Sequence, residues 1–324
     1  MKSKSPFDDE ALHLQLLVQK KHGWDLENDI PWDLGIKTDA FLAPLDEDAL
    51  VFPGASAEQR IVISQLLGLM VNQTISEMES SMPKLKLLAW ENKLKAYPVN
   101  PEMFELGELF YEEERKHALS FIRYQELFCK TNNIEPHELN QLLPCALNSN
   151  FMKAITWNAE QGGASFWWLV AAVEEVSVQI FKSVNKCRKE VDPLYYHLHQ
   201  KHAEEEIRHE NYAFLMLEVD HAQRKNLKQN LINKTDLLLA ESAATPWVLT
   251  ELTKIYRARD LKHKSPFFEI LASCIPLMEN MDKRRLIKNL YKDSPYVSWL
   301  VNPNMKTKHH EMQKKTGALS WVSA

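Results

Sequence analysis

The sequence has little glycine and almost no runs of alternating β-branched residues. Only 8 of its 324 residues are glycine, so it offers few positions for tight turns. These two absences argue against a sheet-rich fold and predict long helices joined by short connections. No stretch approaches the roughly 18 to 20 apolar residues that a membrane-spanning helix needs. We therefore expect no such helix.

Cysteine is also scarce, and the charge balance is only weakly acidic. The formal net charge of -5 argues against nucleic acid as the main partner. The opening residues, Met-Lys-Ser-Lys-Ser-Pro, lack the apolar core of a secretory signal, so no signal peptide is expected. The cysteines form no C-x-x-C pair, which predicts reduced thiols and a cytoplasmic location. They are Cys129, Cys145, Cys187 and Cys274.

Helical patterns of apolar residues cover the central part of the chain. Ser56 followed by Gln59 is a capping-box start, and Pro101 opens another helical run. Pro83 is expected to end the first long helix, with a short helix following at about 84–96. The four long helices are predicted at about 56–82, 101–130, 164–190 and 194–221.

These patterns predict an all-α fold with a single helical domain. Residues 1–55 contain a helical pattern at about 8–21 and several prolines, and are expected to form an arm that wraps the core. The core bundle is expected at about 56–221. Residues 222–324 are expected to form a C-terminal helical elaboration packed on the bundle.

The stretch H-A-E-E-E-I-R-H, from His202 to His209, carries the strongest chemical signal. On a helix, His202, Glu206 and His209 stand at i, i+4 and i+7 and share one face. Leu198 and Leu217 fall near the same face, so this face is expected to point into the core. Burying ionisable groups there is costly unless they neutralise one another or a cation lies among them.

A second E-x-x-H pair, Glu114 and His117, repeats the spacing of Glu206 and His209 on another predicted helix. A single E-x-x-H on a helix usually belongs to a solvated charged face. Two such pairs, each preceded by a carboxylate on a further helix, are typical of a carboxylate-bridged two-metal site in a four-helix bundle. The preceding carboxylates are either Glu77 or Glu79, and either Glu174 or Glu175.

Four carboxylates and neutral imidazoles suit a pair of divalent cations. The negative charges of the carboxylates balance the two ions, and mixed oxygen and nitrogen ligation favours iron or manganese over thiolate-preferring metals. Iron is preferred because this ligand set is suited to activating dioxygen. The adjacent carboxylates Glu113 and Glu205 are expected to face solvent or to hold a ligand histidine by its other ring nitrogen. Their neighbours Glu112 and Glu204 carry the same expectation.

This pattern resembles that of the p-aminobenzoate N-oxygenase family of ferritin-like di-iron proteins. The likeness covers roughly residues 60–215 and is distinguished by the extra histidine, His202. It implies a ferritin-like four-helix bundle with additional flanking helices, and it favours Glu79 and Glu175 among the alternatives. The implied metal ligands are Glu79, Glu114, His117, Glu175, His202, Glu206 and His209.

The resemblance implies a non-haem di-iron oxygenase that oxidises an amine, typically an arylamine, towards a hydroxylamine or nitro product. Its cofactors would be two Fe ions, with Mn as the alternative. Its partners would be a small-molecule substrate, dioxygen and an electron donor such as a ferredoxin-like protein. No catalytic residue beyond the metal ligands is expected. The protein is expected to form a homodimer.

Two other functions use a similar cage of ligands. A hydrocarbon-oxidising enzyme resembling the acyl-carrier-protein desaturases would need a surface for an acidic carrier. Arg284, Arg285 and the basic C-terminal tail offer one, but His202 argues against this function. A ferroxidase or iron-binding protein is the second alternative. Such chains are usually one short bundle, whereas about a hundred residues follow the predicted bundle here.

Overall fold

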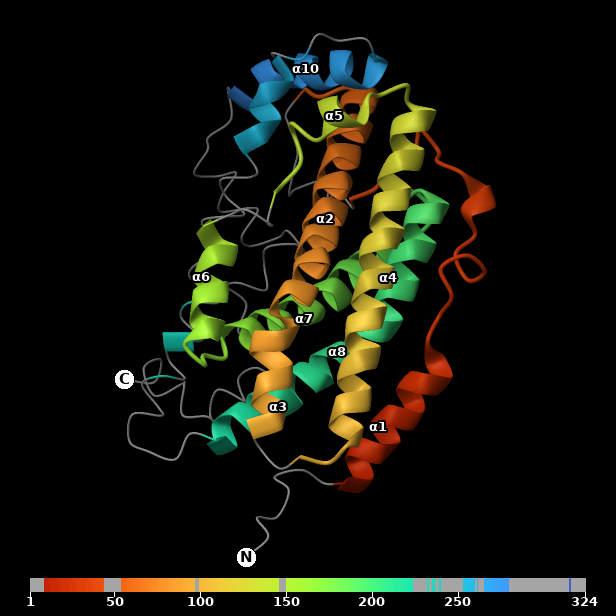
Figure 1. Ribbon diagram of the computed structural model, residues 1–324. Helices are drawn as coiled ribbons and strands as arrows, with labels where there is room; N and C mark the ends of the chain where they lie inside the picture. The colour runs from red at the N-terminus through yellow and green to blue at the C-terminus, as the bar shows by residue number, and fades with distance from the viewer. Residues whose placement is uncertain are drawn as a thin grey trace, which may run out of the picture.

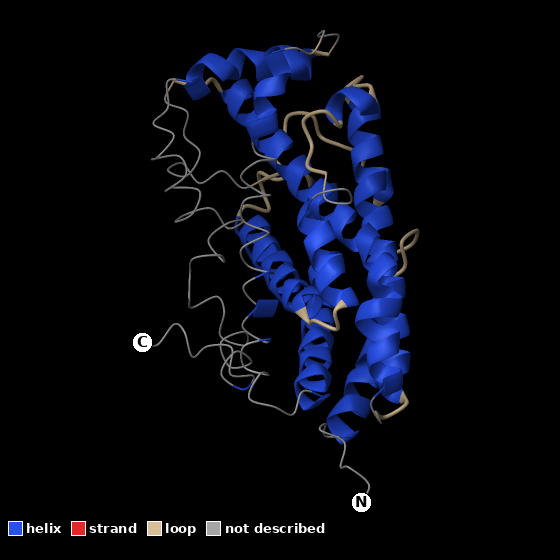
Figure 2. Cartoon of the chain, turned by 60° about the vertical axis from the view of Figure 1, so that its left-hand side comes forward, coloured by secondary structure: helices blue, strands red, loops and turns tan. Residues whose placement is uncertain are grey.

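The regular structure of the chain is helical. The computed structural model describes residues 9–43, 54–96, 99–145, 150–223, 253–259 and 265–279, with positions 232, 235, 236, 239, 261 and 315. Within these residues, strand pairing is limited to an isolated bridge between Phe41 and Val191. The remaining regular structure is helical, as Figure 2 shows. The all-α prediction is therefore confirmed for the described part. No helix in this part is long and apolar enough to cross a membrane.

Four long helices pack together in the centre of the molecule. In Figure 1, α2 and α4 run in opposite directions side by side, and so do α7 and α8. Helix α4 also packs against α8, which joins the two pairs. Their bounds, close to the predicted ones, are Ala57–Leu85 for α2, Glu102–Thr131 for α4, Ser165–Lys186 for α7 and Pro193–Gln223 for α8.

Shorter helices surround these four. Helix α1 packs on α4 and α8, as the predicted arm requires, and α10 packs on α2. Most of the predicted C-terminal elaboration lies outside the described residues. The shorter elements are α1 (Asp9–His22), η1 (Trp32–Leu34), η2 (Lys86–Glu91), α3 (Asn92–Ala96), α5 (Pro136–Leu139), α6 (Asn150–Glu160), η3 (Thr253–Arg259) and α10 (Pro266–Glu279).

Side chains fix the starts of two long helices. At the start of α2, the Ser56 hydroxyl accepts from the Gln59 backbone N–H at 3.2 Å, and the Gln59 side chain accepts from the Ser56 N–H at 2.9 Å. This is the predicted capping box. Asp192 precedes α8 and accepts from the Tyr195 N–H at 2.8 Å. Both caps satisfy backbone donors that the first helical turn leaves unpaired.

Pro83 does not end the first long helix, contrary to the prediction. Helix α2 continues through Pro83 to Leu85, and the chain then passes through the π-helical η2 into α3. Proline has no N–H to donate to the carbonyl of Glu79, yet α2 tolerates the loss of this one hydrogen bond, and the π-helical turn begins only at Lys86. The turn places Trp90 against Gly107 of α4, where an added Cβ would lie 2.3 Å from the indole ring.

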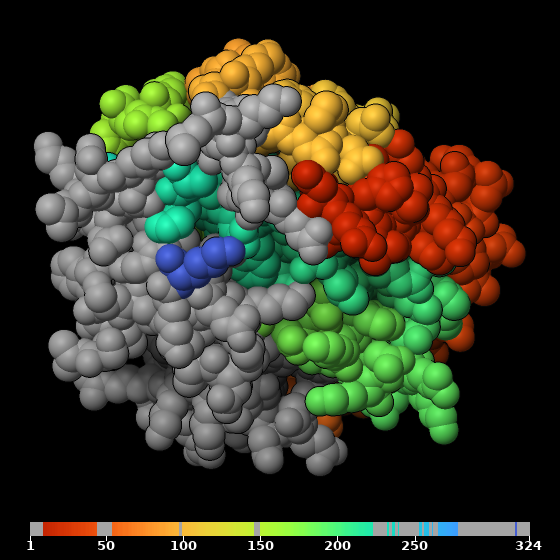
Figure 3. Space-filling view, turned by 90° about the horizontal axis from the view of Figure 1, so that it is seen from below, coloured from red at the N-terminus to blue at the C-terminus, as the bar shows by residue number. Residues whose placement is uncertain are grey.

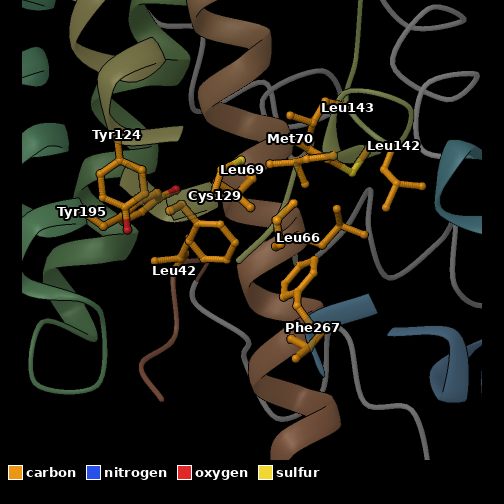
Figure 4. Packing of buried hydrophobic residues seen from close by; sticks show 14 of the residues in the cluster. Leu42, Leu66, Leu69, Met70, Tyr124, Cys129, Leu142, Leu143, Tyr195 and Phe267 are labelled. Atoms are coloured by element: carbon orange, nitrogen blue, oxygen red, sulfur yellow. The ribbon is translucent and has the colours of Figure 1, made fainter. Parts of the chain in front are cut away.

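A polar level interrupts the apolar core about halfway along the bundle. One buried cluster includes Met78, Phe110 and Tyr212, and a second includes Leu69, Phe121 and Leu198. Figure 4 shows part of the second cluster, around Leu66, Leu69 and Tyr195. On α4 and α8, most of the buried residues between the two clusters are carboxylates and histidines, and Glu79 of α2 lies against His202 at the same level. The fold therefore places ionisable groups where apolar packing would otherwise continue.

Candidate metal centre

Each of the four long helices brings buried ionisable side chains to this polar level. None of these residues is more than 2% exposed. Burying that many carboxylates and imidazoles is stable only if their charges compensate one another or a cation does so. Helix α2 contributes Glu79, α4 contributes Glu114 and His117, α7 contributes Glu174, and α8 contributes His202, Glu206 and His209.

The two E-x-x-H pairs meet across the interface between α4 and α8. The Nδ1 atom of His209 lies 2.8 Å from Glu114 Oε1 and 2.8 Å from Glu206 Oε2. The Nδ1 atom of His117 lies 3.2 Å from Glu206 Oε1. Each pair therefore contributes a carboxylate and an imidazole to one common space. The two pairs that sequence spacing singled out are brought together.

His202 and Glu79 complete one side of this space. His202 Nε2 lies 2.8 Å from Glu79 Oε1 and also contacts Glu206 Oε1. Glu77, the alternative on α2, is only half-buried, and its carboxylate accepts from Gln73 instead. The structure thus places Glu79 with His202, as the resemblance implied for α2.

The donor atoms form two overlapping groups, each able to hold a metal ion. One comprises Glu79, His117, His202 and Glu206, and the other comprises Glu114, His117, Glu206 and His209. Within each group the donor atoms all lie within 4.8 Å of one another. Both groups contain His117 and Glu206, so the two positions are adjacent. A carboxylate in the place of Glu206 is suited to bridging two ions.

Several of these donor atoms make no hydrogen bond although they are fully buried. They include both carboxylate oxygens of Glu114, one oxygen of Glu206 and Nδ1 of His117. Glu114 lies close to His209, and Glu206 lies close to His117. The geometry at these atoms is nevertheless not that of a hydrogen bond. Buried donor atoms that are gathered within a few ångströms of one another without a hydrogen bond suit a cation. The residues therefore fit a metal site, since unpaired buried polar atoms are otherwise rare.

On α7 the structure brings Glu174, not Glu175, to the cluster. Glu174 is 2% exposed, and burial raises its pKa well above the usual value, with further raising by the charges of Glu206 and Glu114. Glu175 is only half-buried. Neither residue belongs to the two donor groups, but Glu174 interacts directly with Glu206, which belongs to both. One residue turns the side chain by about 100° around a helix. Glu174 therefore occupies the place that the resemblance gave to Glu175.

Glu113 and Glu205 each precede the glutamate of an E-x-x-H pair, and each contacts the histidine of the other pair. Glu113 of α4 accepts from His209 Nε2 at 2.8 Å, and Glu205 of α8 pairs with His117 Nε2 at 2.6 Å. Each motif thus holds the histidine of the other helix. These contacts turn both Nδ1 atoms towards the cluster. Of the two expectations for these carboxylates, the structure shows the histidine-holding one.

The N-terminal arm supplies a further layer of contacts that sequence reasoning missed. Gln19 donates to Glu113 Oε2 at 2.9 Å, and the Trp24 backbone N–H donates to Glu205 Oε1 at 3.1 Å. These contacts join residues 94 and 181 positions apart in the sequence. No local spacing rule links residues so distant, although a polar Gln19 in helical register with Leu12 and Leu16 is a weak signal.

The close packing of acids and imidazoles shifts their proton affinities in opposite directions. Burial alone would lower the pKa of His117, but the carboxylates of Glu206, Glu205 and Glu79 outweigh it and raise that pKa to about 10. Burial likewise opposes, but does not prevent, a lowering of the Glu206 pKa well below its usual value by the surrounding histidines. Burial raises the pKa of Glu79 to about 7. Without a cation, the cluster is therefore neutralised by protons, held both on its histidines and on the carboxylates whose pKa burial raises.

Metal binding should therefore release protons. Coordination through Nδ1 requires a neutral imidazole, and the raised pKa of His117 means that this ring is protonated at neutral pH. Raising the pH towards that pKa removes the competing proton, so affinity should rise about tenfold per pH unit for each proton released. Mn(II) titrations by calorimetry between pH 6 and pH 8, in buffers of different ionisation enthalpy, would measure this. A heat independent of the buffer would contradict it.

Comparisons with known proteins assign no family to this cluster. No family model matches the chain, and neither the curated proteins nor the solved structures gave a match. The arrangement of four buried glutamates and three buried histidines on four helices is therefore interpreted from its own geometry, as a candidate site for two metal ions.

Proposed function

We propose that this protein binds two iron ions in the polar level of its bundle and uses them to activate dioxygen for the oxidation of an amine. The observation that carries the proposal is the pair of overlapping donor groups that share His117 and Glu206. Because Glu206 belongs to both groups and a carboxylate can bridge, two bound ions would lie side by side, as a reaction with dioxygen at two metals requires.

The charge and type of the donors support two divalent ions of the iron or manganese class. The carboxylates of Glu79, Glu114, Glu174 and Glu206 supply four negative charges, and the imidazoles supply nitrogen donors without charge. Thiolate ligation plays no part, because the buried Cys129 and Cys274 belong to the apolar cluster above the polar level. Such mixed oxygen and nitrogen ligation favours iron or manganese over softer metals.

Aromatic rings fix the orientation of the three histidines. Trp24 stacks on His117 with ring centroids 5.6 Å apart and an interplanar angle of 11°. Phe110 meets His209 edge-on at 5.0 Å, and Phe121 meets the ring of His202 at 4.9 Å. These contacts and the outer carboxylates hold the rings before metal enters, and the apolar walls exclude water. Bound iron would supply the electrons for dioxygen activation, while the chain positions its ligands and keeps the site dry.

The amine is proposed as substrate because of His202. Its side chain is fully buried between Glu79 and Glu206, so a third imidazole faces the cluster. That third histidine is the residue on which the resemblance to the p-aminobenzoate N-oxygenases rests. A small-molecule amine, dioxygen and an external electron donor would be the partners of this reaction.

Anaerobic loading with Fe(II), followed by oxygen and a panel of arylamines, tests this function. We expect hydroxylamine or nitro products by mass spectrometry, and we expect His202→Leu to retain much of the iron but form far less product. Oxidation of acyl-carrier substrates instead would favour the desaturase-like alternative. Oxygen uptake with formation of Fe(III) but no oxidised organic product would favour a ferroxidase.

A further inference from the structure

A short segment of the N-terminal arm, residues 19–24, lies directly over the outer carboxylates of the metal centre. It comprises the end of α1 and the two residues that follow, on the side where α1 packs against α4 and α8 (Figure 3). A Cβ added to Gly23 would lie 3.6 Å from Glu113 Oε1 and 3.7 Å from Glu205 Oε1. The backbone at Gly23 therefore faces both histidine-holding carboxylates at once.

At one end of this segment, Gln19 contacts the pair formed by Glu113 and His209. The Gln19 side chain is 1% exposed, and its Nε2 donates to Glu113 Oε2 at 2.9 Å. The same oxygen contacts His209 Nε2 at 2.8 Å. Because that oxygen receives both groups, the amide fixes the direction from which the carboxylate holds the imidazole.

At the other end, Trp24 contacts the pair formed by Glu205 and His117. The Trp24 N–H donates to Glu205 Oε1 at 3.1 Å, while the other oxygen of that carboxylate holds His117 Nε2. Lys116 contacts both Glu205 and Trp24. Its Nζ lies 2.7 Å from Glu205 Oε1, 2.9 Å from the Trp24 carbonyl oxygen and 4.1 Å from the centre of the indole ring. Trp24 is thus held by its N–H, its carbonyl and its ring.

We propose that residues 19–24 are a positioning element of the metal centre and that docking of this segment and retention of the metal are coupled. The proposal rests on the proposed metal site. Outer partners of ligand histidines typically change metal affinity by about 10-fold to 100-fold when they are removed. Coupling between two binding events is reciprocal, so a segment that strengthens metal binding must itself be held more firmly when metal is bound.

The segment also separates the pairs from solvent. A polar cavity of about 430 Å³ lies on its outer side, lined in part by Gly23, Trp24 and Arg208. Gly23 is exposed, whereas Glu205 beneath it is fully buried. Displacing this one layer of chain would therefore bring water to both histidine-holding carboxylates and open a path by which metal leaves.

The first test compares Gln19→Leu with Gln15→Leu. Gln15 lies one turn earlier on α1, and among the described residues its amide bonds to the Arg208 backbone oxygen alone, at 3.4 Å. Mn(II) dissociation constants would be measured for both variants and the wild type by competition with a chelator. We expect weakening of about 10-fold or more for Gln19→Leu and of less than about 3-fold for Gln15→Leu. Equal affinities for the two variants would overturn the proposal.

A second test needs no variant, so it holds even where Gln19→Leu folds poorly. Hydrogen exchange at the Trp24 amide and tryptic cleavage after Lys20 and Lys21 would be followed in the wild type with and without Mn(II). Both rates should fall on metal binding. Rates that do not change while Mn(II) binds would overturn the coupling alone, whereas a wild type that binds no Mn(II) would overturn the metal site and this proposal together.

Discussion

Replacing Glu206 with alanine should remove most of the iron from both positions of the centre. Its carboxylate belongs to both donor groups and contacts His117, His202 and His209. Without Glu206, both donor groups lose the carboxylate that they share. The charges of two bound cations would then exceed those of the remaining carboxylates. We expect iron content, measured by plasma mass spectrometry after desalting, to fall from about two to below about 0.5 per chain. His117→Ala, which removes the other shared donor, should act in the same way.

Glu204→Ala is the matched control for this experiment. Glu204 lies two residues earlier on the same helix, but its side chain is 45% exposed and pairs with Lys201 at 3.2 Å. Its removal should leave the iron content unchanged. Full iron occupancy in a folded Glu206→Ala variant, checked by circular dichroism, would rule out the proposed centre.

Glu174→Gln should weaken iron binding strongly, whereas Glu175→Gln should not. The two substitutions remove the same charge from neighbouring positions and preserve side-chain volume. Glu174 is buried next to Glu114 and Glu206, so its loss removes one of the four charges that balance two divalent ions. We expect about one iron per chain to be lost in Glu174→Gln, because one cation then lacks its balancing carboxylate.

The reverse result would be equally informative. Loss of iron in Glu175→Gln with full occupancy in Glu174→Gln would mean that α7 presents its other carboxylate to the metals. The choice implied by the resemblance to the N-oxygenases would then stand in place of the one the structure favours.

Much of the helical framework follows from local sequence signals. The capping box at Ser56 acts within a few residues, so spacing alone predicts it. The continuation of α2 through Pro83 is not predictable locally, because it leads into a π turn that packs Trp90 against Gly107. That contact joins two helices and leaves no local trace.

The candidate site was only partly predictable for similar reasons. The i, i+3 and i+4 spacings bring each E-x-x-H pair to one face whatever the neighbouring helices do. The choice between Glu174 and Glu175 depends on the rotation of α7, and residues 165–171 are buried all round, so the first turns give no orientation. The contacts of Gln19 and Trp24 depend on tertiary docking of the arm.

The metal content of the wild-type protein tests the central claim most directly. The chain would be loaded with Fe(II) without oxygen, freed of excess metal and assayed for iron and protein on the same sample. The two overlapping donor groups predict about two irons per chain. A protein that retains none, or that never exceeds one, would contradict a two-metal centre built on His117 and Glu206.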